Sequence, residues 1–75
     1  MNLYYRNETL FVDVDTILDQ EHISKLKRRI FKIVDDYDID RIIFQILEGG
    51  YENRRVLQEL KREYHQRYQG NLLIK

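Results

Sequence analysis

The chain of 75 residues contains no cysteine and no proline. Without cysteine it can form neither a disulfide nor a thiolate metal site, so the disulfide staples that small secreted domains usually need are excluded. No apolar run approaches the roughly 20 residues that span a bilayer, and no signal peptide is recognisable. We therefore expect a cytoplasmic protein with no part in a membrane.

Hydroxyl groups and histidines are also scarce. Aliphatic hydroxyls occur only at Thr9, Thr16 and Ser24. The two histidines, His22 and His65, fall in different expected helices and have no evident partner ligand. With no cysteine and with the one serine in a helix, no nucleophile and base can be paired. We expect no enzymatic activity, no catalytic residue, no cofactor and no metal site.

Charge is balanced, with 13 basic and 13 acidic residues. A net charge of zero argues against bulk binding of nucleic acid, but it leaves local patches open. An acidic cluster at Asp35, Asp36, Asp38 and Asp40 lacks the spacing, the glycine and the final glutamate of a calcium loop. This cluster predicts a solvated turn.

Apolar patterning predicts four strands and two helices. Aromatic and β-branched residues dominate the first two strands, which a polar turn joins into a hairpin. Apolar residues at helical spacing mark both helices. In chain order, the expected elements are strands 3–5 and 9–14, a helix ending near residue 37, strand 41–47, helix 54–69 and strand 72–75.

Capping residues indicate the helix ends. Thr16 or Asp19 is the candidate N-cap of the first helix. For the second helix, Asn53 is the expected N-cap and Gly70 the expected glycine just beyond the end.

The order β-β-α-β-α-β predicts a single α/β domain over residues 1–75. Its four-stranded mixed sheet would begin with an antiparallel hairpin, and right-handed crossovers would put both helices on one face. Strand alternation divides the sheet into two sets, and the pattern leaves open which set meets the helices. The first set is Leu10, Val12, Val14, Ile42, Phe44, Ile46, Leu72 and Ile74, and the second is Tyr4, Phe11, Asp13, Ile43, Gln45, Leu47 and Leu73. Since one apolar face stays uncovered, we expect a homodimer or other sheet-mediated self-association.

The segment LEGGYENRRVLQEL, residues 47–60, is the candidate site. Its adjacent glycines fit neither the Walker nor the dinucleotide pattern. Its arginines could hold an anion, but at a helix start they oppose the helix dipole. The segment nevertheless follows a central parallel strand, where open α/β sheets usually carry their sites. We expect a protein partner to contact Gly49, Gly50, Tyr51, Glu52, Asn53, Arg54 and Arg55.

A basic stripe runs along the first helix. Lys25, Arg28, Arg29 and Lys32 fall at positions i, i+3, i+4 and i+7. The stripe predicts either a face for a polyanion or acidic partner, or a solvated outer face. We favour the solvated face, because no aromatic residues are interleaved for stacking on bases.

Several segments together resemble the STAS domain of anti-sigma factor antagonists: the opening hairpin, DVDTILDQEHISKLKRRIFKIV, the RIIFQIL strand and the VLQEL helix start. In that family, an Asp-Ser-x-Gly-Leu motif opens the helix after the central strand. Aligned without gaps, the motif's aspartate falls on Asn53, its phosphorylated serine on Arg54 and its glycine on Val56. Its leucines fall on Leu57 and Leu60, and the family's strand aspartate falls on Gln45.

The resemblance implies a STAS-like module for protein–protein interaction without the serine phospho-switch. No serine or threonine follows Ser24, and Arg54 is positive where phosphorylation would place negative charge. Tyr51 is the one hydroxyl left in the loop. Two alternatives stay open, a small nucleic-acid or polyanion binder and a designed or purely structural domain.

Overall fold

The computed structural model describes residues 1–75 and contains four strands and two helices. It confirms the expected β-β-α-β-α-β order. The elements are β1 (Asn2–Arg6), β2 (Thr9–Val14), α1 (Gln20–Asp36), β3 (Arg41–Ile46), α2 (Gly50–Tyr68) and β4 (Asn71–Ile74).

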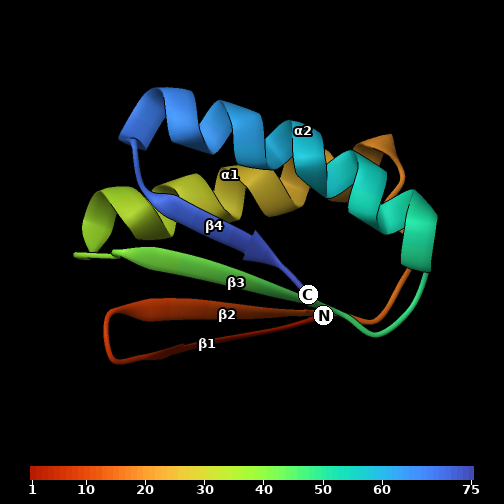
Figure 1. The fold of residues 1–75 in the computed structure, drawn as a ribbon, viewed down its shortest axis with the longest axis horizontal. Coiled ribbons are helices and arrows are strands. Elements are labelled where there is room, and N and C mark those ends of the chain that lie inside the picture. The colour runs from red at the N-terminus through yellow and green to blue at the C-terminus, as the bar shows by residue number, and fades with distance from the viewer.

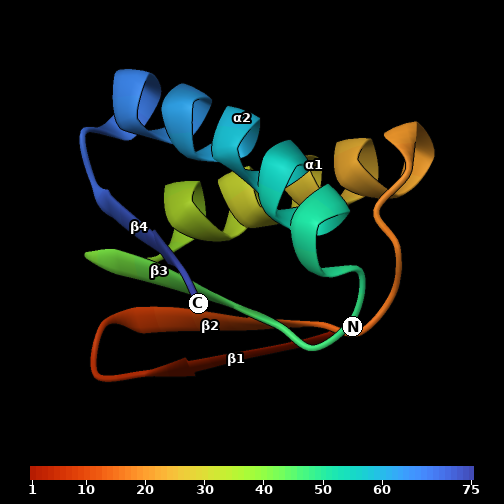
Figure 2. The same cartoon turned by 45° about the vertical axis from the view of Figure 1, so that its right-hand side comes forward.

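The strands form one mixed sheet in the order β1-β2-β3-β4. β1 pairs with β2 antiparallel, and the other two pairs are parallel. Because the parallel strands lie side by side in chain order, right-handed crossovers carry both helices over the same face. Figures 1 and 2 show this two-layer arrangement, with α1 and α2 on one side of the sheet.

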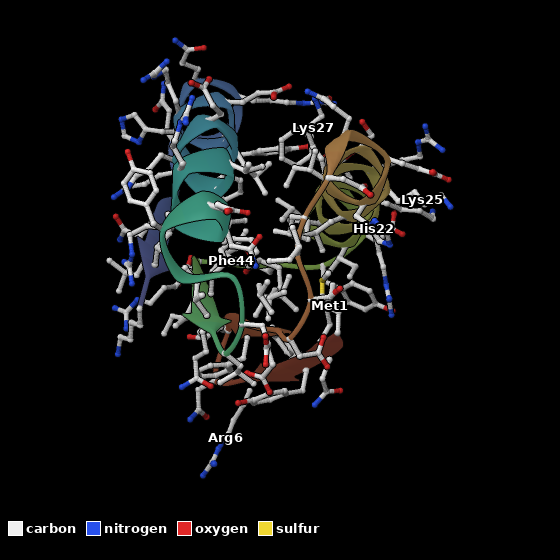
Figure 3. The ribbon with its side chains drawn as sticks, turned by 90° about the vertical axis from the view of Figure 1, so that its right-hand side faces the viewer. Met1, Arg6, His22, Lys25, Lys27 and Phe44 are labelled. Atoms are coloured by element: carbon white, nitrogen blue, oxygen red, sulfur yellow. The ribbon has the colours of Figure 1, made fainter.

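The core lies between the sheet and the helices, which settles the question that strand alternation left open. Val12, Val14, Ile42 and Phe44 are completely buried and belong to the set that meets the helices. Figure 3 shows Phe44 in the space between the two layers. The helices contribute Leu26, Ile30 and Phe31 from α1 and Leu57, Leu60 and Tyr64 from α2.

The start of α1 agrees with one of the two expected caps. The Asp19 carboxylate accepts a hydrogen bond from the backbone N–H of His22 at 2.8 Å, which identifies Asp19 as the N-cap. The same N–H, and then the His22 side chain, hold the pKa of the Asp19 carboxyl below its ordinary value. Thr16 lies outside the helix.

The expected start of α2 was wrong. The helix begins at Gly50, so Asn53 lies within its first turn and is not the N-cap. At the other end Gln69 is the C-cap, so Gly70 lies just beyond the end as expected, but the left-handed residue is Gln69, with φ 58°. Gly70 is small for another reason, because a Cβ there would lie 2.5 Å from the Tyr64 hydroxyl oxygen.

Neither helix combines the length and the apolar composition that crossing a membrane requires.

The β1–β2 turn carries local strain. Asn7 and Glu8 have φ values of 52° and 60°, as the two central residues of a type I′ hairpin turn require. Asparagine accepts this conformation readily, whereas glutamate does so only at a cost. The Asp40 carboxyl also raises the pKa of Glu8 above its ordinary 4.5, because it favours the protonated form by hydrogen bonding and by charge.

We predict that Glu8→Gln raises the thermal midpoint at neutral pH and that Glu8→Gly raises it further. The first change removes the repulsion from Asp40, and the second also relieves the left-handed strain. Thermal unfolding followed by circular dichroism would measure both. A midpoint lowered by Glu8→Gly would contradict the account of the turn.

The effect of Glu8→Gln should depend on pH. Since the folded pKa of Glu8 is raised, its charge destabilises the fold fully above that raised pKa and not at all below the unfolded value. The advantage of Glu8→Gln over the unmodified chain should therefore shrink as pH falls toward 4. An advantage that is constant across this range would show that charge repulsion is not its cause.

Candidate functional site

The candidate site lies at the carboxyl end of the parallel strands, where the chain enters each helix. The β2–α1 connection spans residues 15–19 and the β3–α2 connection spans residues 47–49. The backbone N–H groups of Leu47 and Glu48 both donate to the carbonyl oxygen of Val14, at 2.8 and 3.2 Å. The β3–α2 connection is therefore bonded to the last residue of β2, where the β2–α1 connection begins (Figure 2).

Asn53 ties the two connections to α2. Its side chain is completely buried. Its Oδ1 accepts from the Leu18 N–H at 2.8 Å, and its Nδ2 donates to the carbonyl oxygens of Thr16 and Glu48, both at 2.7 Å. One side chain thus satisfies backbone groups in both connections, and we call these three hydrogen bonds the Asn53 clamp.

Gly49 is required by the clamp. It has φ 76°, and a Cβ there would lie 2.5 Å from Nδ2 of Asn53 and 2.8 Å from Cδ1 of Ile17. Gly50 has φ 22°, but a Cβ there would meet nothing within 4 Å. Both glycines therefore serve a sharp turn, and close packing against Asn53 and Ile17 applies to Gly49 alone.

The structure places the expected contact residues mostly on the first turns of α2, with Gly49 alone before the helix. Tyr51 is 76% exposed, and Glu52, Arg54 and Arg55 are also exposed. The expectation that a partner touches Asn53 was wrong, since that side chain is buried and its polar atoms are used within the clamp.

The two arginines of the segment have different surroundings. The Arg54 guanidinium donates to the carbonyl oxygen of Ile74 at 3.3 Å, which takes it to the edge strand β4. Arg55 lies beside Ile17 and Glu52 along a shallow groove. The two guanidinium groups are therefore engaged on different sides of the helix start.

The sequence pattern missed two exposed apolar residues at the same end. Ile17 is 49% exposed in the β2–α1 connection, and Leu47, which was expected to be the last residue of a strand, is 63% exposed beyond β3. An apolar residue between polar neighbours in a connection was the available signal for Ile17. We call Ile17, Leu47 and Tyr51 the loop-end patch.

The basic stripe of α1 is partly neutralised. Lys25 pairs with Glu21 and Lys32 pairs with Asp36, each at 3.2 Å and one helical turn apart. Arg28 makes no ion pair, and the same holds for Arg29, which borders an apolar groove between α1 and β1. The pairing lowers the positive charge that the stripe offers to a polyanion.

The remaining polar groups make local contacts or link the two helices. No group of three or more histidine, aspartate or glutamate side chains is arranged to hold a metal ion. His22 lies 2.7 Å from the carboxylate of its own helix cap, Asp19. Lys27 links the two helices through Glu63 at 3.2 Å, and Figure 3 shows it directed toward the facing helix, while Lys25 extends outward.

No protein-family model, no curated protein and no solved structure matches the chain. The resemblance to the STAS domain therefore rests on the sequence segments that carry it.

We predict that Asn53→Ala lowers the free energy of unfolding by about 3 kcal/mol, because it leaves one backbone N–H and two carbonyl groups without their partner. Urea unfolding of the purified chain would measure the loss. A loss below about 1 kcal/mol would show that the connections hold without the clamp.

Asn53→Asp is the matched variant, since it keeps the shape of the side chain and loses the two donors. At neutral pH its carboxylate would face two carbonyl oxygens, so we expect it to be at least as destabilising as Asn53→Ala. Its deficit relative to the unmodified chain should shrink in acid, where a protonated carboxyl can donate again.

Gly49→Ala should destabilise the fold more than Gly50→Ala. Both changes strain a left-handed backbone, but only the first also places a Cβ against Asn53 and Ile17. Thermal midpoints of the two variants, compared side by side, provide the measurement. Equal losses would mean that backbone strain alone explains the glycines.

Proposed function

We propose that the chain is a non-enzymatic protein–protein interaction module that binds a partner through the loop-end patch. The observation that carries this proposal is the exposure of three large apolar side chains at one end of a domain of 75 residues. Single exposed apolar residues are ordinary on protein surfaces, whereas a group of them is typical of an interaction site.

The framework beneath the patch supports the same proposal. Tyr51 follows the turn at Gly49, which the Asn53 clamp fixes, and Ile17 and Leu47 extend from the two bonded connections. A patch on a rigid support loses little conformational entropy when it binds a partner. Tyrosine is also among the residues that most often dominate binding energy.

Charged residues of both signs surround the patch. Glu48 and Glu52 lie beside Arg54 and Arg55 in the chain, and all four are exposed. A polar rim around an apolar centre is the usual composition of a protein interface. We infer a protein partner with an apolar pocket and a rim of mixed charge.

The resemblance to the STAS domain of anti-sigma factor antagonists supports a regulatory version of this proposal. In that family the helix start after the central strand is the switch region, and here Arg54 occupies the serine position. We infer a cytoplasmic regulatory protein whose binding is not controlled by serine phosphorylation.

We predict that Tyr51→Ala weakens partner binding by about 30-fold, the effect of losing a central aromatic anchor of about 2 kcal/mol. Affinity capture from the cells that make the protein, with quantitative mass spectrometry, would identify the proteins lost. Titration of the captured partner would then give the affinity.

Tyr37→Ala is the control for this experiment. Tyr37 is also an exposed tyrosine, but it follows α1 at the opposite end of the sheet. It should retain every partner that Tyr51→Ala loses. Identical sets of captured proteins for the two variants would rule out the loop-end patch as the binding site.

A further inference from the structure

The sheet face opposite the helices is covered by nothing within the chain. Figure 3 shows Arg6 extending from the sheet away from both helices. The strand register arranges the side chains of this open face in three rows across the sheet. The first row is Arg6, Thr9, Arg41 and Asn71, the middle row is Tyr4, Phe11, Ile43 and Leu73, and the third row is Asn2, Asp13 and Gln45, with Lys75 beyond β4.

The middle row is apolar across all four strands. Tyr4 and Phe11 stack with ring centroids 5.0 Å apart. Ile43 is buried between its neighbours, while Tyr4 and Leu73 at the two edges are 42% and 41% exposed. A continuous apolar row of this kind is a surface that water solvates poorly.

The two outer rows differ in charge. In the first row, Arg6 and Arg41 lie on either side of Thr9, and neither makes an ion pair. In the third row, Asp13 lies between two neutral residues, and Lys75 lies at the far end, beyond β4. Its Oδ1 is shielded from solvent and accepts no hydrogen bond. A buried oxygen without a partner costs free energy, and the other oxygen, Oδ2, is the one that a donor from outside can reach.

We propose that the open face binds the open face of a second copy of the chain, related by a two-fold axis that runs along the middle row. This rotation keeps each strand opposite its own counterpart and exchanges the two outer rows. The apolar rows then face each other across the axis. Asp13 of each copy comes to lie over Thr9 of the other, between Arg6 and Arg41, whose guanidinium groups can donate to the Oδ2 of its carboxylate.

The charges select this axis over its alternative. A two-fold axis parallel to the strands would lay each outer row on the same row of the second copy. The row with Arg6 and Arg41 would then lie along the same row of the second copy, which is repulsive, and Asp13 would lie over Gln45 and meet no arginine. The axis along the middle row avoids this overlap and brings Asp13 beside the arginines of the second copy in a closed dimer.

The size of the face sets the strength of the dimer. Four strands about 4.8 Å apart and about five residues long give a flat patch of roughly 320 Å² per copy. This projection lies below the roughly 800 Å² per partner of a standard stable interface. We therefore expect a reversible dimer with a dissociation constant on the order of 100 μM.

This inference does not rest on the proposed function. The loop-end patch lies at the end of the strands and the open face lies across them, so a partner and a second copy can be bound at the same time. Failure of one proposal leaves the other standing.

Sedimentation equilibrium of the unmodified chain from about 10 μM to 1 mM tests the dimer. Asp13→Arg alone, and Arg6→Asp with Arg41→Asp, should each raise the dissociation constant by tenfold or more. Combining all three changes places an arginine between two aspartates of the second copy and should restore the dimer to within about threefold.

Arg28→Asp on α1 is the matched charge reversal away from the sheet and should leave the dissociation constant unchanged. Circular dichroism confirms that each variant folds. A chain that stays monomeric at 1 mM would overturn the proposal. So would a dimer that is insensitive to Asp13→Arg, or a triple variant that stays monomeric while it is folded.

Discussion

The three hydrogen bonds of Asn53 are the interaction on which the rest of the candidate site depends. Apolar packing holds the helices on the sheet, but it does not fix the connections at their ends. One buried amide does so, by satisfying Leu18, Thr16 and Glu48 together. The constraint extends to Gly49, which must lack a side chain for the amide to fit. The exposure of the loop-end patch follows from this arrangement.

The sequence predicts the architecture well and the clamp not at all, for a physical reason. Apolar periodicity and the handedness of crossovers are local or topological rules, so they give the order of elements and of strands. The bonds of Asn53 reach residues 35 and 37 positions away. No spacing rule connects such residues, so Asn53 looks like an N-cap in the sequence. The early start of α2 at Gly50 is missed for the same reason.

The residues of the candidate site also divide into those that local rules identify and those that depend on distant contacts. Tyr51 and the two arginines could be found because they follow a central strand, where sites usually occur. Ile17 and Leu47 could not, because their exposure depends on how two distant connections meet. The basic stripe is a local feature. Lys25 and Lys32 each pair with an acidic residue four positions away, Glu21 and Asp36, and this spacing is visible in the sequence.

The two proposed surfaces have a joint geometric consequence. A two-fold axis along the middle row, perpendicular to the strands, makes the strands of the two copies run in opposite directions. The loop-end patches, at the carboxyl ends of those strands, then point away from each other. Such a dimer would bridge two partner molecules, because its two loop-end patches could not bind the same molecule. Its binding would therefore gain no avidity on a single target. Because the face is small, bridging would require a high local concentration of the chain. Concentration would then control assembly where a serine phospho-switch is missing.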